Sequence, residues 1–140
     1  MRRTEHALVR GDARMLDDPL AAQSISLVIG AVLAADDADL LTVTEQGYGK
    51  RTAMSEYLVH SEDGQTRPQG RGGKGRRDIQ TGNRNGRVAD IRAVREGDSL
   101  MFISAEGMLV RIPADDISRI GRNTKGVRIV SLKDDDRLIA

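Results

Sequence analysis

The chain has 140 residues, a formal net charge of +1 and no cysteine, which excludes a disulfide framework and a thiolate metal site. One Phe, two Tyr and no Trp leave almost no aromatic surface for stacking unpaired bases, so a reader of single-stranded nucleic acid is disfavoured. His6 and His60 lie far apart in the sequence, and we expect solvated side chains rather than metal ligands.

The first 38 residues differ from the rest of the chain. Residues 15–18 followed by 28–29 resemble residues 132–135 followed by 138–139, so residues 1–38 are interpreted as the degenerate tail of a preceding repeat unit or an irregular N-terminal extension. The apolar run 25–35 is too short to span a bilayer, and the acidic residues upstream do not suit an export signal. We expect a buried strand there, and no membrane partner.

The remaining residues repeat. A shift of 60 aligns residues 40–47 with 100–107, and a shift of 51 aligns residues 70–75 with 121–126. The first unit, residues 39–98, therefore carries nine extra residues, which we place in an exposed connection within 58–68. The second unit is residues 99–140.

Short β-rich runs predict strands at residues 40–44, 88–94, 100–104, 108–112 and 127–132. Gly47 and Gly107 stand at hairpin-turn positions, and Pro113 closes a strand where it has no ladder bond to donate. No stretch has a helical period. The predicted fold is all-β and propeller-like, with about two complete blades plus the tail of a third. Two blades cannot close a ring, so open sheet edges are expected to favour self-association.

The segment Gln69-Gly70-Arg71-Gly72-Gly73-Lys74-Gly75 alternates cations with glycines, a pattern that suits gripping the phosphates of a nucleic acid. Residues 67–95 hold nine Arg or Lys and two Asp, a local charge of +7, whereas residues 1–39 hold four Arg and seven acids. Such segregation of charge is expected where one surface meets a polyanion.

Several motifs resemble the C-terminal domain of the DNA gyrase A subunit. They are Gly47-Tyr48-Gly49-Lys50-Arg51-Thr52, Ser55-Glu56-Tyr57, Arg84-Asn85-Gly86 and the stretch 117–128. The resemblance covers about residues 39–140 and includes the gyrase A box, Gln-Arg-Arg-Gly-Gly-Lys-Gly, with Gly70 in place of the first Arg. One lost cation is expected to weaken the grip on DNA without abolishing it.

The resemblance implies a β-pinwheel that wraps duplex DNA around a basic rim, in the bacterial cytoplasm at the nucleoid. The partners that it implies are the gyrase B subunit, together with the rest of the gyrase A subunit, in a type IIA topoisomerase that supercoils DNA. ATP and magnesium are used elsewhere in that holoenzyme, and this chain alone is expected to have no cofactor, metal or catalytic residue. The predicted DNA-binding residues are Gln69, Gly70, Arg71, Gly72, Gly73, Lys74, Gly75, Arg76, Arg77, Arg122 and Lys125, with Lys50, Arg51, Arg111 and Arg128 as weaker candidates.

Rival interpretations of the motifs fit less well. A nucleotide-binding P-loop needs Ser or Thr after the lysine and a helix to follow, but Lys74 is followed by Gly75. An Arg-Gly-Gly RNA-binding tail is repetitive and disordered, whereas this segment is flanked by strand-like sequence. Paired acids fall at turn positions, and Tyr57 aligns with Ile117, so packing explains it better than catalysis.

Two alternatives to the gyrase interpretation stay open. One is the C-terminal domain of the topoisomerase IV A subunit, which the nearly intact box disfavours. The other is a protein–protein interaction module that pairs through open blade edges.

Overall fold

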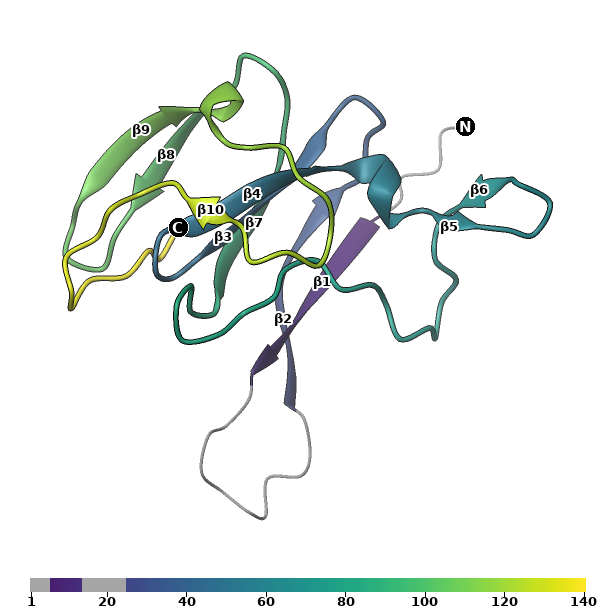
Figure 1. The fold of residues 1–140 in the computed structure, drawn as a ribbon, viewed down its shortest axis with the longest axis horizontal. Helices are drawn as coiled ribbons and strands as arrows, with labels where there is room; N and C mark the ends of the chain where they lie inside the picture. The colour runs from purple at the N-terminus through teal and green to yellow at the C-terminus, as the bar shows by residue number, and fades with distance from the viewer. Residues whose placement is uncertain (1–5, 14–24) are drawn as a thin grey trace.

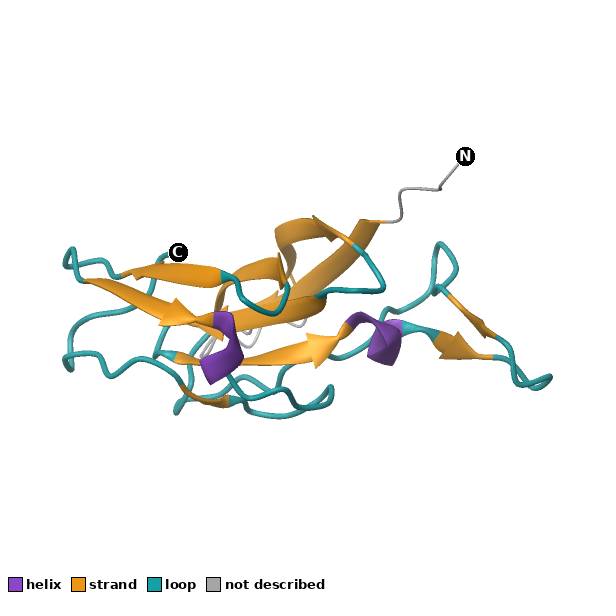
Figure 2. Cartoon of the chain, turned by 90° about the horizontal axis from the view of Figure 1, so that it is seen from above, coloured by secondary structure: helices purple, strands orange, loops and turns teal. Residues whose placement is uncertain are grey.

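A computed structural model describes residues 6–13 and 25–140 of the chain, and these residues form strands joined by loops and two short 3-10 helices (Figures 1 and 2). The all-β prediction is confirmed. In chain order the elements are β1 (His6–Ala13), β2 (Ile25–Leu33), β3 (Asp39–Thr44), β4 (Tyr48–Ala53), η1 (Met54–Tyr57), β5 (Val59–His60), β6 (Thr66–Arg67), β7 (Val88–Val94), β8 (Ser99–Ile103), β9 (Leu109–Pro113), η2 (Ala114–Asp116) and β10 (Val127–Arg128).

Four strands form the largest sheet, in the order β10-β4-β3-β7, and we call this sheet the first blade. Strands β3, β4 and β7 come from the first repeat unit, whereas β10 comes from the second and lies along β4, with Val127 opposite Gly49. Gly126 precedes β10 with φ 72°, and a Cβ there would lie 2.9 Å from the carbonyl oxygen of Gly49. A side chain at this position would push the two strands apart.

The repeat seen in the sequence is a repeat of structure. Gly47 and Gly107 turn the β3–β4 and β8–β9 hairpins with φ 82° and 88°, and each donates its N–H to the residue three positions earlier at 3.1 Å. A second bond repeats as well: the amide of Glu45 donates to the carbonyl of Arg87, and that of Ala105 donates to Arg137, both at 2.8 Å. The predicted hairpin turns are therefore confirmed.

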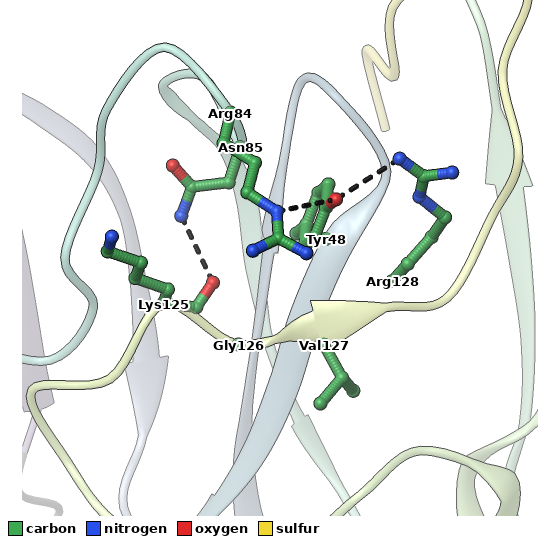
Figure 3. A pocket seen from close by; sticks show the side chains of 7 residues that line it. All are labelled: Tyr48, Arg84, Asn85, Lys125, Gly126, Val127 and Arg128. Carbon is green, nitrogen blue, oxygen red and sulfur yellow. Dashed lines mark hydrogen bonds between the residues drawn. The ribbon is translucent and has the colours of Figure 1, made fainter.

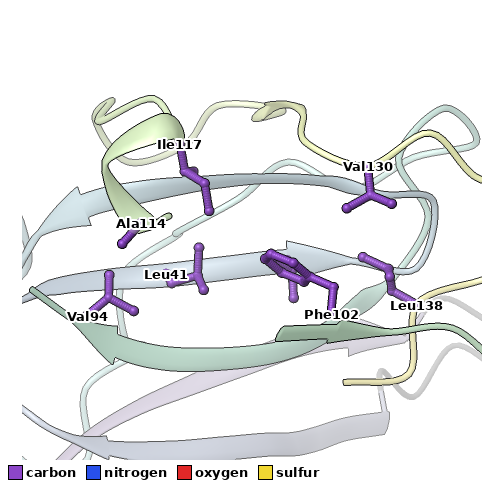
Figure 4. Close-up of a cluster of buried hydrophobic side chains, with 8 residues drawn as sticks. Leu41, Val94, Phe102, Ala114, Ile117, Val130 and Leu138 are labelled. Atoms are coloured by element: carbon purple, nitrogen blue, oxygen red, sulfur yellow. The ribbon is translucent and has the colours of Figure 1, made fainter. Parts of the chain in front are cut away.

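The main hydrophobic core lies between the first blade and the β8–β9 hairpin (Figure 4). Its buried side chains are Leu41, Val43, Val94, Phe102, Ala114, Ile117, Val130 and Leu138. Residues of both repeat units therefore share one core, and removing either unit would expose apolar surface worth about 25 cal/mol per Å².

Strand β2 covers a second, smaller cluster that includes Leu40 and Ile91. Ile29 and Val32 pack against it, whereas Val28 and Leu33 are 61% and 52% exposed. The expectation of a strand was right, but burial holds for one face only. The register of β2 against β1 skips Ile29, and this β-bulge interrupts the alternation of side chains, so that Ile29 and Val32 face the same cluster. The proposed similarity of residues 15–18 to 132–135 and the side chain of His6 lie outside the described residues.

One predicted strand is shorter than expected, the predicted exposed connection contains two short strands, and one strand was not predicted. Strand β10 ends at residue 128 rather than 132, because the amides of Ile129 and Val130 both donate to the carbonyl of Gly47 and so leave the regular ladder. The extra residues of the first unit form the exposed hairpin β5–β6. Strand β4 has no apolar run to predict it, because it carries Gly49, Lys50 and Arg51.

Candidate nucleic-acid interface

The segment 69–75, here called the box loop, leaves the β5–β6 hairpin and is exposed along its whole length. Arg71 and Lys74 are both exposed, and neither forms an ion pair with any residue that the structure describes. A Cβ at Gly70 would meet nothing within 4 Å, whereas one at Gly73 would lie 2.5 Å from the side-chain amide of Gln69. The loop thus presents two free cations on a backbone that a ligand can approach.

The loop 121–126, here called the second loop, shares the backbone conformation of the box loop. Gly72 and Asn123 both have positive φ, 79° and 57°, as do Gly75 and Gly126, 76° and 72°. These are the pairs that the shift of 51 residues predicts. Asn123 is the one described non-glycine residue with positive φ, and asparagine tolerates that region better than most side chains.

Asp78 fixes the end of the box loop to the first blade. Its carboxylate is buried and accepts hydrogen bonds from the hydroxyls of Thr42, at 2.6 Å, and Tyr57. The ammonium of Lys50 lies 3.2 Å from the same carboxylate and also donates to the carbonyl of Gly121 at 2.9 Å. One buried lysine therefore holds the ends of both loops.

The two loops run side by side where they join the blade. The amide of Asn123 donates to the carbonyl of Asp78 at 2.6 Å, and the amide of Gln80 donates to Thr124 at 2.8 Å. Arg122 donates from a terminal nitrogen to the carbonyl of Arg77 at 3.3 Å, while its buried Nε has no partner among the described residues. The structure thus brings Arg77 and Arg122 together, with Arg71 and Lys74 farther out along the box loop.

Two of the weaker candidates for DNA contact are interior residues. Lys50 is fully buried, and burial lowers the pKa of its ammonium while the carboxylate of Asp78 opposes that shift. Arg51 is 9% exposed, donates from Nε to the carbonyl of Ile117 at 2.8 Å and lies 3.5 Å from the carboxylate of Asp39. Lys50 has no surface exposed to solvent, and the guanidinium of Arg51 is occupied by these partners, so neither is available to a phosphate, contrary to the expectation of DNA contact.

Part of the positive charge of residues 67–95 is already compensated. Arg95 forms an exposed ion pair with Asp37 at 2.9 Å, and Arg92 pairs with Asp90 at 3.2 Å. Hydrogen bonding from Arg95 lowers the pKa of the Asp37 carboxyl. The cations that remain for a polyanion are therefore concentrated in the box loop and beyond it toward Arg84.

A pocket of about 410 Å³ opens where the second unit meets the first blade, and we call it the junction pocket (Figure 3). It is lined by Tyr48, Arg84, Asn85, Lys125, Gly126, Val127 and Arg128. The hydroxyl of Tyr48 accepts hydrogen bonds from Nε of Arg84 and a terminal nitrogen of Arg128, both at 3.1 Å. These two hydrogen bonds lower the pKa of the phenol, and the bond from Arg84 has the larger effect.

Asn85 holds this pocket in shape. It is 2% exposed, and its side-chain amide donates to the carbonyls of Gln80 and Lys125 at 2.8 and 3.0 Å. Its side-chain oxygen Oδ1 accepts a hydrogen bond from the backbone amide of Gly82 at 2.9 Å. Of the predicted DNA-binding residues, Lys125 lines the pocket, together with Arg128 from the weaker candidates.

The sequence search missed the importance of Asp78, Tyr48 and Arg84. Tyr48 and Arg84 belong to motifs that resemble the gyrase family, so a signal was present for both. Asp78 carried none, because an isolated acid next to a basic run is interpreted as a solvated side chain until its buried partners are known.

A model of the DNA gyrase C-terminal domain, beta-propeller, matches residues 38–65, 67–95 and 98–140. The A subunit of DNA gyrase from Haloquadratum walsbyi is 46% identical over 110 residues, which cover 76% of this chain. The same protein from Kosmotoga olearia is 45% identical over 105 residues, or 75% of this chain. In each case the chain spans 12% of the length of the relative.

Solved structures give the same fold. A structure of the DNA gyrase A C-terminal domain matches with a TM-score of 0.69 and 28% identity, over 82% of this chain and 36% of that one. The C-terminal domain of DNA topoisomerase IV matches with a TM-score of 0.63 at 19% identity, over 82% of this chain and 33% of that one, and shows the fold alone. The predicted partial β-pinwheel is thereby confirmed.

The first residues match a different family. A model of the type VII secretion system ESX-1 transport TM domain B matches residues 1–38, so the two family matches meet at residue 38. Within the described parts of the chain, no helix has the length and apolar character needed to cross a membrane.

The match to the gyrase family covers most of the chain, and it includes the box loop, the first blade and the β8–β9 hairpin. It agrees with the relatives in sequence and with the solved structure in fold. The chain therefore belongs to the family of DNA gyrase C-terminal domains with the beta-propeller fold.

Proposed function

We propose that this chain binds and wraps duplex DNA without sequence preference, as a C-terminal part of the A subunit of DNA gyrase. In that holoenzyme, ATP and magnesium act at sites on other parts of the assembly, and the wrapped DNA gives the strand crossing its hand. The working place is the bacterial cytoplasm, on the nucleoid. The chain itself supplies phosphate contacts and no catalytic group.

The observation that carries this proposal is that Arg71 and Lys74 are exposed on an anchored loop and form no ion pair with residues 6–13 or 25–140. A cation already paired with a carboxylate gains little from a phosphate, whereas a free one releases condensed counterions from DNA when it binds. Asp78 holds the end of the box loop to a buried lysine, so the loop loses less freedom on binding than a loose segment would.

Wrapping also has an energetic requirement. Bending a duplex costs about 1–6 kcal/mol for a site of 20–30 base pairs, and phosphate contacts must offset that cost. Arg76, Arg77, Arg122 and Lys125 extend the row of cations beyond the box loop, which supports contact along a path rather than at one point. Contacts of this kind fix position and carry no sequence information.

Binding to a duplex of about 40 base pairs across a salt series tests the proposal, with an Arg71→Ala/Lys74→Ala variant beside the natural chain. We expect affinity to fall steeply with salt, and the variant to bind more weakly with a slope shallower by about one unit per lost phosphate contact. Arg92→Ala/Arg95→Ala is the matched control, since it removes the same charge from arginines that are already paired.

Equal binding by the natural chain and the box variant would overturn the proposal. Topoisomerase IV is the nearest alternative, and supercoiling by the parent holoenzyme separates the two. Negative supercoiling supports gyrase, whereas relaxation and decatenation without it would indicate topoisomerase IV.

An interaction module is a second candidate, and one observation favours it. The β8–β9 sheet has two strands while the first blade has four, and Leu109 and Met101 are 63% and 55% exposed on it. Strand β10 shows how a neighbouring unit closes such an edge. Self-association that is insensitive to salt, without DNA binding, would favour this role; sedimentation of the natural chain beside Leu109→Lys measures it.

A further inference from the structure

We propose that the junction pocket is a phosphate-binding site, in which a phosphate group joins the second repeat unit to the first blade. This inference depends on the proposed DNA binding in one respect, namely whether the phosphate belongs to DNA. The pocket itself is argued from its own charges and geometry.

Three cations surround the pocket: Arg84 from the first unit, and Lys125 and Arg128 from the second. No lining residue is acidic, and within the described parts of the chain none of the three cations lies within ion-pair distance of a carboxylate. Like charges held together repel each other unless an anion is present. The cluster therefore carries uncompensated positive charge that a phosphate would balance.

Tyr48 organises the two guanidinium groups. Each lies 5.4 Å from the centroid of its ring, and both donate one N–H to its hydroxyl oxygen from opposite sides (Figure 3). Cation–π attraction and the two hydrogen bonds hold them in place, so they are not loose surface side chains. Each guanidinium keeps further N–H groups for a ligand, since it has five in all.

The phenol adds one donor to this set. Its oxygen accepts from both arginines, and its own proton has no acceptor among the described residues. A phosphate in the pocket would accept from Tyr48, Arg84 and Arg128 together. Charge-assisted bonds of this kind are about twice as strong as neutral ones.

The repeat supplies an internal comparison. The shift of 60 residues places Met108 at the position of Tyr48, and the shift of 51 residues places Asp135 at the position of Arg84. The second unit therefore has neither the phenol nor the arginine, and it has a carboxylate where the cation stands. The phenol and the arginine that the first unit gives to the pocket are therefore not repeated by the fold.

The junction pocket lies at the strand pairing that attaches the second unit to the first blade. Lys125 lies two residues before β10, the strand that the second unit contributes to the first blade, and Arg128 is the last residue of that strand. A phosphate held by both units stabilises that pairing, because a ligand that binds only the assembled state shifts the folding equilibrium toward it. Binding at the pocket is therefore coupled to the attachment of the second unit.

Thermal unfolding in inorganic phosphate, compared with sodium chloride at equal ionic strength, tests the pocket directly. We expect phosphate to raise the Tm of the natural chain, and Arg84→Gln and Arg128→Gln to lose that rise. Glutamine keeps a donor for Tyr48 while removing the charge. Arg92→Gln is the matched control, since Arg92 is exposed, already paired with Asp90 and not part of the pocket lining, and it should keep the full rise.

Each variant is compared with its own Tm in chloride, so a general loss of stability does not mimic the result. A rise that survives in Arg84→Gln and Arg128→Gln, or one that is absent from the natural chain, overturns the proposal. A second arm measures binding of the same variants to the 40-base-pair duplex across salt. If the salt dependence of DNA affinity is shallower by about one unit in the pocket variants than in the natural chain, the bound phosphate belongs to DNA. If the salt dependence is unchanged while the Tm rise is lost, the pocket binds a free phosphate.

The two proposals fail separately. If the box variant binds DNA like the natural chain while the pocket variants lose the Tm rise, the DNA-wrapping proposal falls and the phosphate pocket stands. If the box variant weakens DNA binding and the pocket variants keep the Tm rise, the reverse holds.

Discussion

Lys50 and Asp78, 28 positions apart, form a buried ion pair at the root of the box loop, with the ammonium nitrogen 3.2 Å from the carboxylate oxygen. Lys50 also donates to the carbonyl of Gly121, so the same side chain reaches the second loop. This contact links the exposed cations of the candidate interface to the core of the first blade.

Replacing Lys50 by Met should lower the free energy of unfolding by about 3–5 kcal/mol, because the carboxylate of Asp78 is left buried and unpaired. Urea unfolding measures the loss. Lys50→Met/Asp78→Asn should lose less than the single variant, since the remaining group is neutral. Equal losses in the two variants would mean that packing of the lysine stem, and not its charge, holds the site.

The two hairpin glycines should respond differently to alanine. Both have positive φ, which costs an alanine about 1–2 kcal/mol. A Cβ at Gly47 would also lie 2.2 Å from the carbonyl oxygen of Val130, whereas one at Gly107 meets nothing within 4 Å. Gly47→Ala should therefore destabilise the chain more than Gly107→Ala in urea unfolding. Equal effects would show that the second unit can move away from the turn.

Restoring the missing cation of the box should strengthen DNA binding. Gly70 has open space around it and no positive φ, so an arginine fits without strain. Gly70→Arg should raise the affinity for duplex DNA and steepen its salt dependence by about one unit. Ala105→Arg, which adds the same charge at the exposed turn of the β8–β9 hairpin, is the control for net charge. An equal gain in DNA affinity in both variants would mean that the position of the added charge in the box loop has no special importance.

The two tyrosines should titrate apart. Hydrogen bonds from Arg84 and Arg128 lower the pKa of Tyr48, whereas burial, reinforced by Asp78, raises the pKa of Tyr57. The ultraviolet absorbance of phenolate should therefore show one early ionisation and one delayed until the chain unfolds. Arg84→Gln should move the early step upward, and an unmoved step would contradict its assignment to Tyr48.

The raised pKa of Tyr57 also predicts how the stability of the fold changes at alkaline pH. The folded pKa of Tyr57 lies above its unfolded value of about 10, so its contribution is fully present below that pH and is lost as the pH rises. Unfolding at alkaline pH, followed by circular dichroism, should accompany the second ionisation. In Tyr57→Phe the second ionisation is absent, and the loss of stability with rising pH should be smaller than in the natural chain.

The sequence by itself determined the local structure and the chemistry of the box loop. Gly47 and Gly107 predicted the two hairpin turns, because few other residues adopt positive φ at low cost. The shift of 51 residues predicted a shared backbone for residues 70–75 and 121–126, and Gly72 and Asn123 bear this out. These features depend on neighbours in sequence, and so they are written in it.

Only the tertiary structure decided which charges are available. Lys50 and Arg51 look like Arg71 and Lys74 in sequence. Lys50 and Arg51 are buried beside carboxylates, whereas Arg71 and Lys74 are exposed and have no ion-pair partner in the part of the chain that the structure describes. The junction pocket unites positions 48, 84, 125 and 128, which approach because β10 crosses to the first blade. Compensation of a charge depends on distances of a few ångströms between remote segments, and these are fixed by strand register and packing rather than by spacing along the chain.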